Sequence, residues 1–312
     1  MKNILAVRND RFGEFLLIIP ALRALKERFP GSRITIAASP DVLELAEAVG
    51  YVDGTIAWEN KKRPSGEILA LVKKLKEKKF DLAVIFNPSK ESNLVTFLAK
   101  IPVRVGYDRK WPWLLTDKMK DEKESSGKHE VDHNLELVGL VGASTKDRSL
   151  ALNIKSADVL GALKGSPIVV IHPWTSDPVK QWPLKNFKKL IERFSGMNVL
   201  VIGGREELLK NKNFLNDLPA EAVNLVGRTS LVGLAGILKR ADILVSGDSG
   251  PVHLAAAVGT PVVALFRNDM PGKTAVRWGP WGNGHVVIEK AKLEYIAVDE
   301  VVKKVREKLA IC

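Results

Sequence analysis

Short hydrophobic runs alternate with helical patterns of hydrophobic and polar residues along most of the chain. The runs predict strands at Ile4–Val7, Arg33–Ala37, Leu82–Ile85, Val103–Gly106, Ile168–Ile171, Asn198–Ile202, Ile243–Val245, Val262–Phe266 and Val286–Ile288. Amphipathic helices are predicted at Glu67–Lys78, Leu184–Phe194, Leu231–Ala241 and Asp299–Leu309. Continuous runs of Val, Ile and Leu are typical of strands that are buried on both faces. The alternation therefore predicts an α/β protein with parallel, doubly wound sheets.

The chain is long enough for two domains. Its 312 residues exceed one ordinary hydrophobic core, and two domains of about 150 residues each are expected. Ser156–Lys164 is predicted to form a short connecting helix before a new strand begins at Pro167. We therefore divide the chain into residues 1–158 and 159–312, with the last helix a candidate to pack back on the first domain. Ligands bind at the carboxyl ends of parallel strands, so we expect a site in a cleft between two facing domains.

The segment 243–266 is the most informative part of the sequence, and it predicts a strand, a tight turn, a helix and a second strand. Ser246–Gly250 permit a sharp turn, Ser249 is a candidate N-cap, and Pro251 suits the first helical turn. Such a turn directs backbone N–H groups and the positive end of the helix dipole outward, which favours a phosphate or diphosphate. His253 is a candidate additional donor. The alternative is a strand–helix turn that binds nothing.

A polar segment, Arg8–Glu14, follows the first predicted strand. Glu14 falls near a helix N-terminus, where the dipole together with Arg8 and Arg11 is expected to favour the ionised carboxylate. An ionised carboxylate at the edge of a cleft is a competent general base for a hydroxyl group. The alternative is that Glu14 only caps the helix.

Three loops of the second half add candidate ligand contacts. In the loop 171–183, Lys180 directly precedes a predicted helix N-terminus. A cation at that place favours binding mainly when an anion lies between the ammonium group and the positive end of the helix dipole. The alternative is that Lys180 is a solvated loop residue. The glycines of Gly203–Glu207 allow a ligand to approach closely. Glu206 there is a candidate to accept hydrogen bonds from ribose hydroxyls, or else an acid at the start of a helix. The loop Asn224–Ser230 suits a nucleotide base.

Charge and composition leave the predicted fold unchanged and bear only on what the protein surface binds. The net charge is +12, and residues 1–155 hold 27 Lys and Arg against 21 Asp and Glu, so the excess of +6 there is half of the total. No separate basic module or nucleic-acid motif stands out, and no nucleic-acid partner is expected. A basic surface fits an anionic membrane leaflet or a phosphorylated substrate. It also fits a lysine-rich thermophilic surface, as does the single glutamine, Gln181.

Several other sequence features narrow the function. Cys312 is the only cysteine, which argues against disulfides and cysteine-based zinc sites.

No apolar run approaches the length of a membrane span, and the first residues lack a signal-peptide pattern, so a cytoplasmic location is expected. His129–His133 matches the H-E-x-x-H zinc signature, but no third ligand is evident and the following pattern fits a packed helix. The chain contains no Asp-x-Asp, which argues against a metal-anchored nucleotide sugar. Asp117–Lys128 is expected to be an exposed mobile loop.

These motifs together resemble glycosyltransferase family 9, the lipopolysaccharide heptosyltransferases, nearly from end to end. The resemblance is carried by Arg8–Glu14 with Pro20–Leu25, Arg104–Tyr107, His172–Trp174 with Lys180–Pro183, Gly203–Glu206, and Ser246–His253, of which the last is the most specific. It implies the GT-B architecture of two Rossmann-like domains. Residues 1–158 would then bind the acceptor, and residues 159–312 the nucleotide-sugar donor.

The resemblance implies that heptose is transferred with inversion from ADP-heptose to the core oligosaccharide on lipid A, with no required metal or other cofactor. By position, Glu14 matches the catalytic base, Lys180 the lysine that neutralises the diphosphate, and Glu206 the ribose-binding acid. The remaining expected donor contacts are Thr175, Gly227, Asp248, Ser249, Gly250 and His253. The family usually has Asp where this chain has Glu14, so the longer side chain changes the reach of the base.

An anionic acceptor is expected to contact basic residues of the first domain. The candidates are Arg8, Arg11, Lys61, Lys62, Arg63 and Arg109, with Trp58, Trp111 and Trp113 close to them in sequence. Clustered cations and amphipathic aromatic side chains suit a phosphorylated sugar at a membrane surface. The expected location is the inner leaflet of the inner membrane, where the protein would act as a peripheral monomer. A solvated thermophilic surface is the alternative.

Two other functions stay open at this point. Another GT-B enzyme, such as a hexosyltransferase or a nucleotide-sugar epimerase, would share the donor-site features. A non-catalytic protein that binds a nucleotide sugar would share them too, but Glu14 would then be dispensable.

Overall fold

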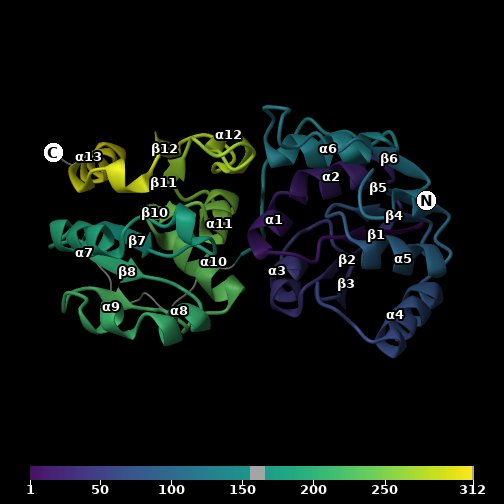
Figure 1. Ribbon diagram of the computed structural model, residues 1–312, viewed down its shortest axis with the longest axis horizontal. Coiled ribbons are helices and arrows are strands. Elements are labelled where there is room, and N and C mark those ends of the chain that lie inside the picture. The colour runs from purple at the N-terminus through teal and green to yellow at the C-terminus, as the bar shows by residue number, and fades with distance from the viewer. Residues whose placement is uncertain (155–165, 311–312) are drawn as a thin grey trace. The chain divides into compact units, whose positions relative to one another are not determined.

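The computed structural model describes residues 1–154 and 166–310, and the chain divides into two compact units, Met1–Asn153 and Ile154–Cys312 (Figure 1). The boundary expected between residues 158 and 159 and the helix expected at Ser156–Lys164 fall outside the described residues. Within the described parts of the chain, no helix is both long enough and apolar enough to cross a membrane.

The first unit contains a parallel six-stranded sheet with the order β3-β2-β1-β4-β5-β6. Its strands are β1 Asn3–Val7, β2 Arg33–Ala38, β3 Gly54–Ala57, β4 Leu82–Ile85, β5 Val103–Tyr107 and β6 Asp117–Met119. Its helices are α1 Phe12–Leu16, α2 Ile19–Arg28, α3 Leu43–Glu47, α4 Ser65–Glu77, α5 Lys90–Leu98 and α6 Glu130–Gly139, with short 3₁₀ turns η1 Pro40–Val42 and η2 Pro112–Leu114. The strand order reverses between β1 and β4, the arrangement that creates a ligand crevice in doubly wound sheets.

The second unit repeats this plan with the order β12-β11-β10-β7-β8-β9, again with parallel pairing throughout. Its strands are β7 Ile168–His172, β8 Asn198–Val201, β9 Val223–Asn224, β10 Ile243–Gly247, β11 Val262–Arg267 and β12 Val286–Lys290. Its helices are α7 Leu184–Arg193, α8 Arg205–Lys210, α9 Lys212–Asn216, α10 Leu231–Arg240, α11 Gly250–Val258, α12 Ala275–Trp278 and α13 Val298–Leu309, with 3₁₀ turns η4 Pro178–Lys180 and η5 Leu293–Tyr295. Here the order reverses between β7 and β10.

The strands and helices predicted from the hydrophobic pattern are present, with shifts of at most two residues at their ends. Three short strands, β3, β6 and β9, were not predicted because none contains a continuous apolar run. Most of Asp117–Lys128 is an exposed loop, as expected, but the segment opens with β6, and the Lys123 side chain within it is buried. The cause is an ion pair with α6, described below, that no local pattern reveals.

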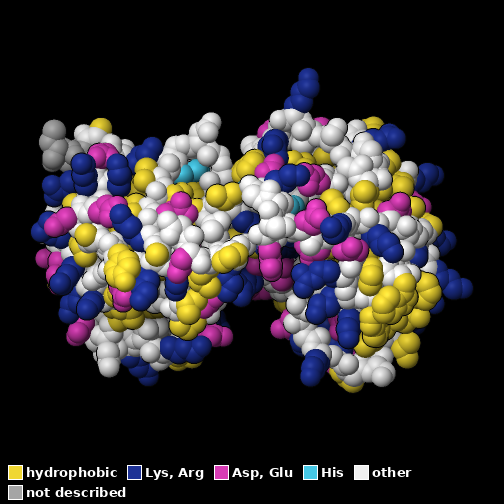
Figure 2. Space-filling model, turned by 45° about the horizontal axis from the view of Figure 1, so that its top comes forward, with side chains coloured by type: hydrophobic (Ala, Val, Ile, Leu, Met, Phe, Trp, Pro, Cys, Tyr) yellow, Lys and Arg dark blue, Asp and Glu magenta, His cyan; other side chains and the backbone are white. Residues whose placement is uncertain are grey.

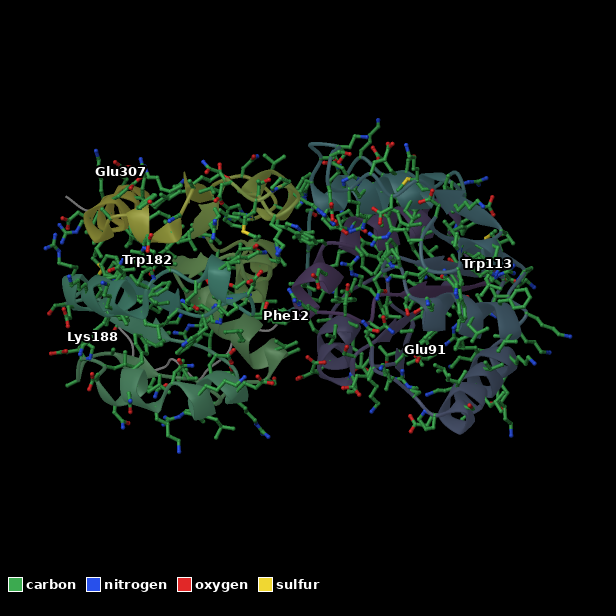
Figure 3. All side chains as sticks on the ribbon, in the orientation of Figure 1. Phe12, Glu91, Trp113, Trp182, Lys188 and Glu307 are labelled. Atoms are coloured by element: carbon green, nitrogen blue, oxygen red, sulfur yellow. The ribbon has the colours of Figure 1, made fainter. Side chains whose placement is uncertain are left out.

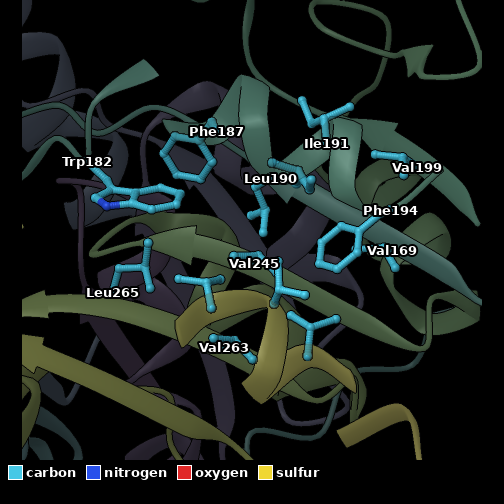
Figure 4. Close-up of a cluster of buried hydrophobic side chains, with 14 of the residues drawn as sticks. Val169, Trp182, Phe187, Leu190, Ile191, Phe194, Val199, Val245, Val263 and Leu265 are labelled. Carbon is cyan, nitrogen blue, oxygen red and sulfur yellow. The ribbon is translucent and has the colours of Figure 1, made fainter. Parts of the chain in front are cut away.

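The core of the second unit lies between its sheet and the helices α7 and α13 (Figure 4). Trp182 is fully buried there, and its ring meets Phe187 edge-on at 4.7 Å between centroids. Its indole N–H donates to the carbonyl of Ile296 at 3.1 Å. The tryptophan thereby anchors the loop between β7 and α7 to the core. That loop carries Thr175 and Lys180.

We expect Trp182→Ala to lower the free energy of unfolding of the second unit by about 3–5 kcal/mol, because it removes a large buried ring and leaves a cavity. Tyr295→Ala is the control, since that ring is 60% exposed in the same unit and its loss should cost less than about 0.5–1 kcal/mol. Urea unfolding of both variants measures the difference. Equal destabilisation by the two substitutions would contradict the role given to Trp182.

Candidate active site

The turn after β10 leads directly into α11. Ser249 occupies the N-cap position with extended backbone, Pro251 lies in the first turn, and Gly259 ends the helix in the left-handed region with φ +85°. The side chain of Ser249 does not cap the helix, contrary to expectation; its hydroxyl lies 2.8 Å from that of Ser246 instead. No serine side chain therefore caps the first backbone N–H groups of α11, although the N–H of Val252 donates to the carbonyl of Ser249 at 3.2 Å. A helix N-terminus without a side-chain cap suits an anion. His253, expected to add a donor here, is buried within this helix.

A buried hydrogen-bonded chain lies beneath this turn. Ser246 on β10 and His172 on β7 are register partners, with Nδ1 of the histidine 3.0 Å from the serine hydroxyl. The same hydroxyl is 3.0 Å from the carbonyl of His172. Burial lowers the pKa of His172 to about 4, so its ring is neutral near pH 7. In the sequence, His172 lies in a recognised motif but has no assigned role. Its contact with Ser246 on the neighbouring strand shows that the histidine holds the turn after β10 in place.

Lys180 and Asp248 come together in this structure. The Lys180 ammonium forms an ion pair with the Asp248 carboxylate, and both side chains are mostly buried. Lys180 lies in η4, in the loop after β7. Asp177 is the N-cap of η4 and accepts a hydrogen bond from the backbone N–H of Val179. Asp248 directly follows β10. The two residues thus come from the loops of the two strands at which the order reverses. The structure therefore places a cation next to the N-terminus of α11, where a diphosphate is expected to bind.

Thr175 belongs to the same part of the second unit. Its hydroxyl donates to the carbonyl of Asp177 at 2.9 Å, and its backbone N–H donates to the side chain of Gln181 at 3.2 Å. A Cβ atom placed on Gly247 would lie 3.0 Å from the Thr175 methyl group. Glycine at this position therefore lets the loop after β7 pack against the end of β10 without displacing the Thr175 methyl group.

Glu206 and Gly227 lie near a second glycine turn. A Cβ atom on Gly203 would be 2.6 Å from the ring of Trp174, so the close approach of these two residues requires glycine. Gly227 has φ +72° and its N–H donates to the carbonyl of Gly203 at 2.8 Å. Glu206, in the first turn of α8, is exposed and bonded to Lys210 at 2.7 Å, and this hydrogen bond lowers its pKa. The carboxylate is ionised and accessible, as acceptance of hydroxyl hydrogen bonds requires.

In the first unit, the end of β1 is fixed to the end of β4 by polar side chains. Arg8 is buried and pairs with Asp10 at 2.8 Å, while its guanidinium also donates to the carbonyl of Phe86 at 3.3 Å. Asn87 donates to the side chain of Asn9 at 2.7 Å. Arg8 is thus held rigidly at the point where the strand order of this sheet reverses. Its buried charge is available to a neighbouring group but is not a freely moving surface cation.

Glu14 lies at the third position of α1, and its carboxylate accepts a hydrogen bond from the backbone N–H of Arg11 at 3.1 Å. Burial raises the pKa of Glu14 above its ordinary value; Arg8 and Arg11 oppose the rise, and Asp10 adds to it. The two arginines favour the ionised form, as expected, but the net shift of the Glu14 pKa is upward because desolvation is the larger effect. A raised pKa makes this carboxylate a stronger base once it is ionised. Arg11 itself is exposed.

The H-E-x-x-H segment has a structural role at the start of α6. His129 is the N-cap and its Nδ1 accepts from the N–H of Val131 at 3.2 Å, while His133 Nε2 lies 2.9 Å from the hydroxyl of Ser126. Over residues 1–154 and 166–310, no three His, Cys, Asp or Glu side chains are grouped so that they could hold a metal ion. Glu130 is buried and pairs with Lys123 at 2.6 Å and with Arg8 at 3.5 Å. The glutamate therefore joins the 120s segment and α6 to the end of β1.

The basic loop before α4 differs from the expected cluster of free cations. The Arg63 side chain is only 9% exposed and pairs with Glu91 at 2.6 Å. Glu91, labelled in Figure 3, also accepts from the indole N–H of Trp58 at 2.8 Å. Trp58 is itself buried in the core. Lys61 is exposed and pairs with Glu59 at 2.9 Å, and Lys62 is exposed as well. Arg63 and Trp58 fasten the loop, so only the two lysines present their charge.

Arg109 lies on the same edge of the sheet, in the loop after β5. Its side chain is about half exposed and pairs with Asp121 at 2.9 Å. Parallel strands bring all of these loops to one edge, so Arg8, the lysines of the 60s loop and Arg109 share the carboxyl edge of the first sheet.

Comparison with known proteins identifies the family. Residues 68–306, most of the chain, match the profile of Glycosyltransferase family 9 (heptosyltransferase). The chain belongs to glycosyltransferase family 9. It is 26% identical to lipooligosaccharide heptosyltransferase 2 of Campylobacter jejuni, with 91% of this chain and 84% of that protein covered. It is 24% identical to lipopolysaccharide heptosyltransferase 3 of Escherichia coli, with 88% and 85% covered.

Solved structures agree with the expected fold. The family 9 glycosyl transferase of Veillonella parvula has a TM-score of 0.86 at 20% identity, covering 99% of this chain and 97% of that one. The E. coli ADP-heptose lipopolysaccharide heptosyltransferase II has a TM-score of 0.84 at 22% identity and covers 99% of both chains. The two Rossmann-like units therefore form the GT-B fold, and this family 9 member is a glycosyltransferase. The expected cleft between facing domains, and the packing of the last helix on the first domain, stay predictions.

We expect Glu130→Gln to lower the free energy of unfolding of the first unit by about 3–5 kcal/mol, because it leaves the buried cations of Lys123 and Arg8 without that carboxylate. Glu136→Gln on the same helix is the matched control. Its partner Lys128 is half exposed, so the loss should be at most about 1 kcal/mol. Chemical denaturation measures both variants. If Glu130→Gln costs no more than Glu136→Gln, the buried network does not stabilise the unit.

Proposed function

We propose that this family 9 glycosyltransferase transfers heptose from ADP-heptose to the inner-core oligosaccharide of lipopolysaccharide, with inversion and without a required metal. The observation that carries the proposal is the Lys180–Asp248 pair beside the N-terminus of α11, at the point where the second sheet reverses its order. A cation and a helix N-terminus together suit a diphosphate. An E. coli heptosyltransferase WaaC with ADP-2-deoxy-2-fluoro heptose has a related fold, with a TM-score of 0.77 at 20% identity.

In the proposed reaction, Glu14 removes the proton from the acceptor hydroxyl as its oxygen attacks the anomeric carbon of the heptose. A new carbon–oxygen bond forms while the bond from that carbon to the diphosphate oxygen breaks, so the configuration inverts. ADP leaves with the electron pair. Negative charge therefore grows on the diphosphate, where Lys180 and the first N–H groups of α11 stabilise it. Lys180 must share or exchange its Asp248 partner as the diphosphate binds.

The remaining predicted donor contacts have defined tasks in this scheme. Glu206 would accept hydrogen bonds from the ribose hydroxyls with its exposed carboxylate. Thr175, Gly227, Ser249, Gly250 and His253 would line the donor site, with the glycines permitting close approach of the ligand. The rigid turn held by His172 and Ser246 keeps the N-terminus of α11 in place before the ligand arrives. Such preorganisation lets the site stabilise charge without rearranging during the reaction.

The acceptor is proposed to bind at the carboxyl edge of the first sheet. Lys61, Lys62 and Arg109 present exposed charge there, Arg11 is exposed at the start of α1, and Arg8 supplies a buried charge near Glu14. Phosphorylated lipid A–core sugars complement these cations. We further propose that the protein works as a monomer at the cytoplasmic face of the inner membrane, where its acceptor is anchored.

Turnover of ADP-heptose against a panel of truncated lipid A–core acceptors tests the proposal. Transfer should require ADP-heptose, and ADP-glucose or UDP-sugars should support little product. Transfer from a different nucleotide sugar would make the protein another GT-B enzyme. Binding of ADP-heptose with no transfer to any acceptor would make it a non-catalytic binding protein.

We expect Glu14→Gln to lower kcat by about 10²–10⁴-fold while ADP affinity stays nearly unchanged, because the general base is lost and the nucleotide site is elsewhere. In the wild type, activity should fall as pH decreases through the raised pKa of Glu14, since the base must be ionised. A carboxyl with a raised folded-state pKa stabilises the fold only at low pH, so Glu14→Gln should not destabilise the protein at pH 7. Activity within a factor of two of wild type would exclude Glu14 as the base.

We expect Lys180→Ala to lower kcat as well as raise KM for ADP-heptose, because the lysine meets charge that grows in the transition state. The acceptor KM should change little. Lys188→Ala on α7 is the control, since that lysine pairs only weakly with Asp217 at 3.4 Å on the surface. If kcat at saturating donor is the same in both variants, Lys180 contributes to binding alone.

A further inference from the structure

The positive charge of the first unit is concentrated in one continuous segment. Residues 59–118 hold 14 Lys and Arg against 7 Asp and Glu. Residues 1–58 hold seven of each, and residues 119–153 hold five basic against seven acidic side chains. The whole excess of the unit therefore lies between the loop before α4 and the start of β6. The net charge of each half of the chain is the same, +6, so a comparison of the two halves does not show this concentration.

The same segment exposes large hydrophobic side chains. Leu69 on α4 is 62% exposed, Phe97 and Leu98 on α5 are 46% and 37% exposed, and Trp113 in η2 is 70% exposed. Figure 3 labels Trp113. We call these four residues the α4–α5 flank. The helices α4 and α5 contact each other, and η2 contacts α5. Figure 2 shows a broad area of hydrophobic side chains on the first unit.

These side chains are not needed to close the core. Ile68 and Leu71 of α4 already pack against the buried cluster of the first unit, whereas Leu69 points away from it. Exposed apolar groups that gather on one face of a folded protein usually mark a binding surface.

Cations lie directly at the edge of the flank. The guanidinium of Arg104 is 5.5 Å from the ring centroid of Phe97, and the ammonium of Lys90 is 5.3 Å from that of Trp111. The rings of Trp111 and Trp113 are 6.1 Å apart. Tryptophan and the long basic side chains are amphipathic and favour the interface between lipid headgroups and acyl chains. Apolar groups bordered by lysine and arginine complement an anionic lipid surface in both hydrophobicity and charge.

We infer that the α4–α5 flank docks the protein onto an anionic phospholipid bilayer. The inference rests on the proposed function, in which the acceptor is carried by a membrane lipid, and it names the surface that meets this membrane. A second copy of the chain fits the flank poorly, because the symmetric contact would bring two segments of net charge +7 together.

Vesicle co-sedimentation tests the inference without any substrate. The wild-type protein should bind vesicles of phosphatidylcholine with phosphatidylglycerol far better than phosphatidylcholine alone, and added salt should weaken this binding. The double variant Leu69→Gln/Phe97→Gln should lower partitioning by about tenfold or more, because two apolar groups no longer enter the bilayer. Leu209→Gln is the matched control: this residue is 68% exposed on α8 of the second unit, and its replacement should leave binding unchanged.

Equal vesicle binding by the double variant and the wild type would overturn the inference, as would failure of the wild type to bind anionic vesicles. Analytical ultracentrifugation tests whether a second copy of the chain binds the flank instead. If the wild type is a dimer and the double variant is a monomer, the flank is a self-association surface and the inference is overturned. Unchanged thermal unfolding establishes that the variant is folded, and the single variant Leu69→Gln, at an exposed helical position, serves if it is not.

Activity assays separate this inference from the proposed function. With a deacylated, water-soluble core acceptor, the double variant should transfer heptose as fast as the wild type. If the wild type binds anionic vesicles through the flank yet transfers no heptose, the proposed function fails and the docking surface stands. If transfer proceeds but vesicle binding does not depend on the flank, only the docking inference fails.

Discussion

Parallel strand pairing is the constraint on which the rest of this structure depends. Because every paired strand in both sheets runs parallel, every strand ends at the same edge of its sheet, and the chain must return through a helix before the next strand begins. Helix N-termini and polar loops therefore collect at that edge. Where the strand order reverses, neighbouring loops diverge to opposite faces and leave room for side chains and ligands. The Lys180–Asp248 pair and the Arg8 network each occupy such a point.

The two reversal points treat their buried ionisable groups differently. In the second unit, burial keeps His172 neutral, and the imidazole serves as a fixed hydrogen-bonding partner for Ser246. In the first unit, burial raises the pKa of Glu14 while Arg8 limits the rise. The desolvated imidazole is thus held neutral, and the desolvated carboxyl holds its proton more tightly than a solvated one. The sign follows from the charge of each group when ionised, since burial always disfavours the charged form.

Ion pairs in the first unit connect segments that lie far apart in the sequence. Glu130 links Lys123 and α6 to the end of β1, and Glu91 links α5 to the loop before α4 through Arg63. Each glutamate lies on a helix and pairs with a basic side chain of a loop at the carboxyl edge of the first sheet. Arg63 and Lys123 are paired with these glutamates and do not present their charge to solvent. The exposed charge of the loop before α4 therefore comes from Lys61 and Lys62.

The two-domain α/β fold, the main strands and helices, and the strand-end motifs can be predicted from the sequence. Continuous Val, Ile and Leu runs and glycine turns report local backbone requirements, such as the left-handed conformation of Gly259 at the end of α11. The resemblance carried by Ser246–His253 supplied the family, which the match over residues 68–306 confirmed. The assigned catalytic and binding roles remain predictions.

Which charged groups pair with one another depends on contacts that form only in the folded protein. The tertiary structure paired Lys180 with Asp248 across 68 residues of sequence, buried Lys123 in a segment that reads as a loop, and took Arg63 and Trp58 out of a cluster that reads as exposed. It also raised the pKa of Glu14 despite the two arginines, because the degree of desolvation depends on neighbours that no local pattern names. Electrostatic partners and burial are set by packing between distant segments, and for that reason the hydrophobic pattern could predict the strands but not the charges that lie at their ends.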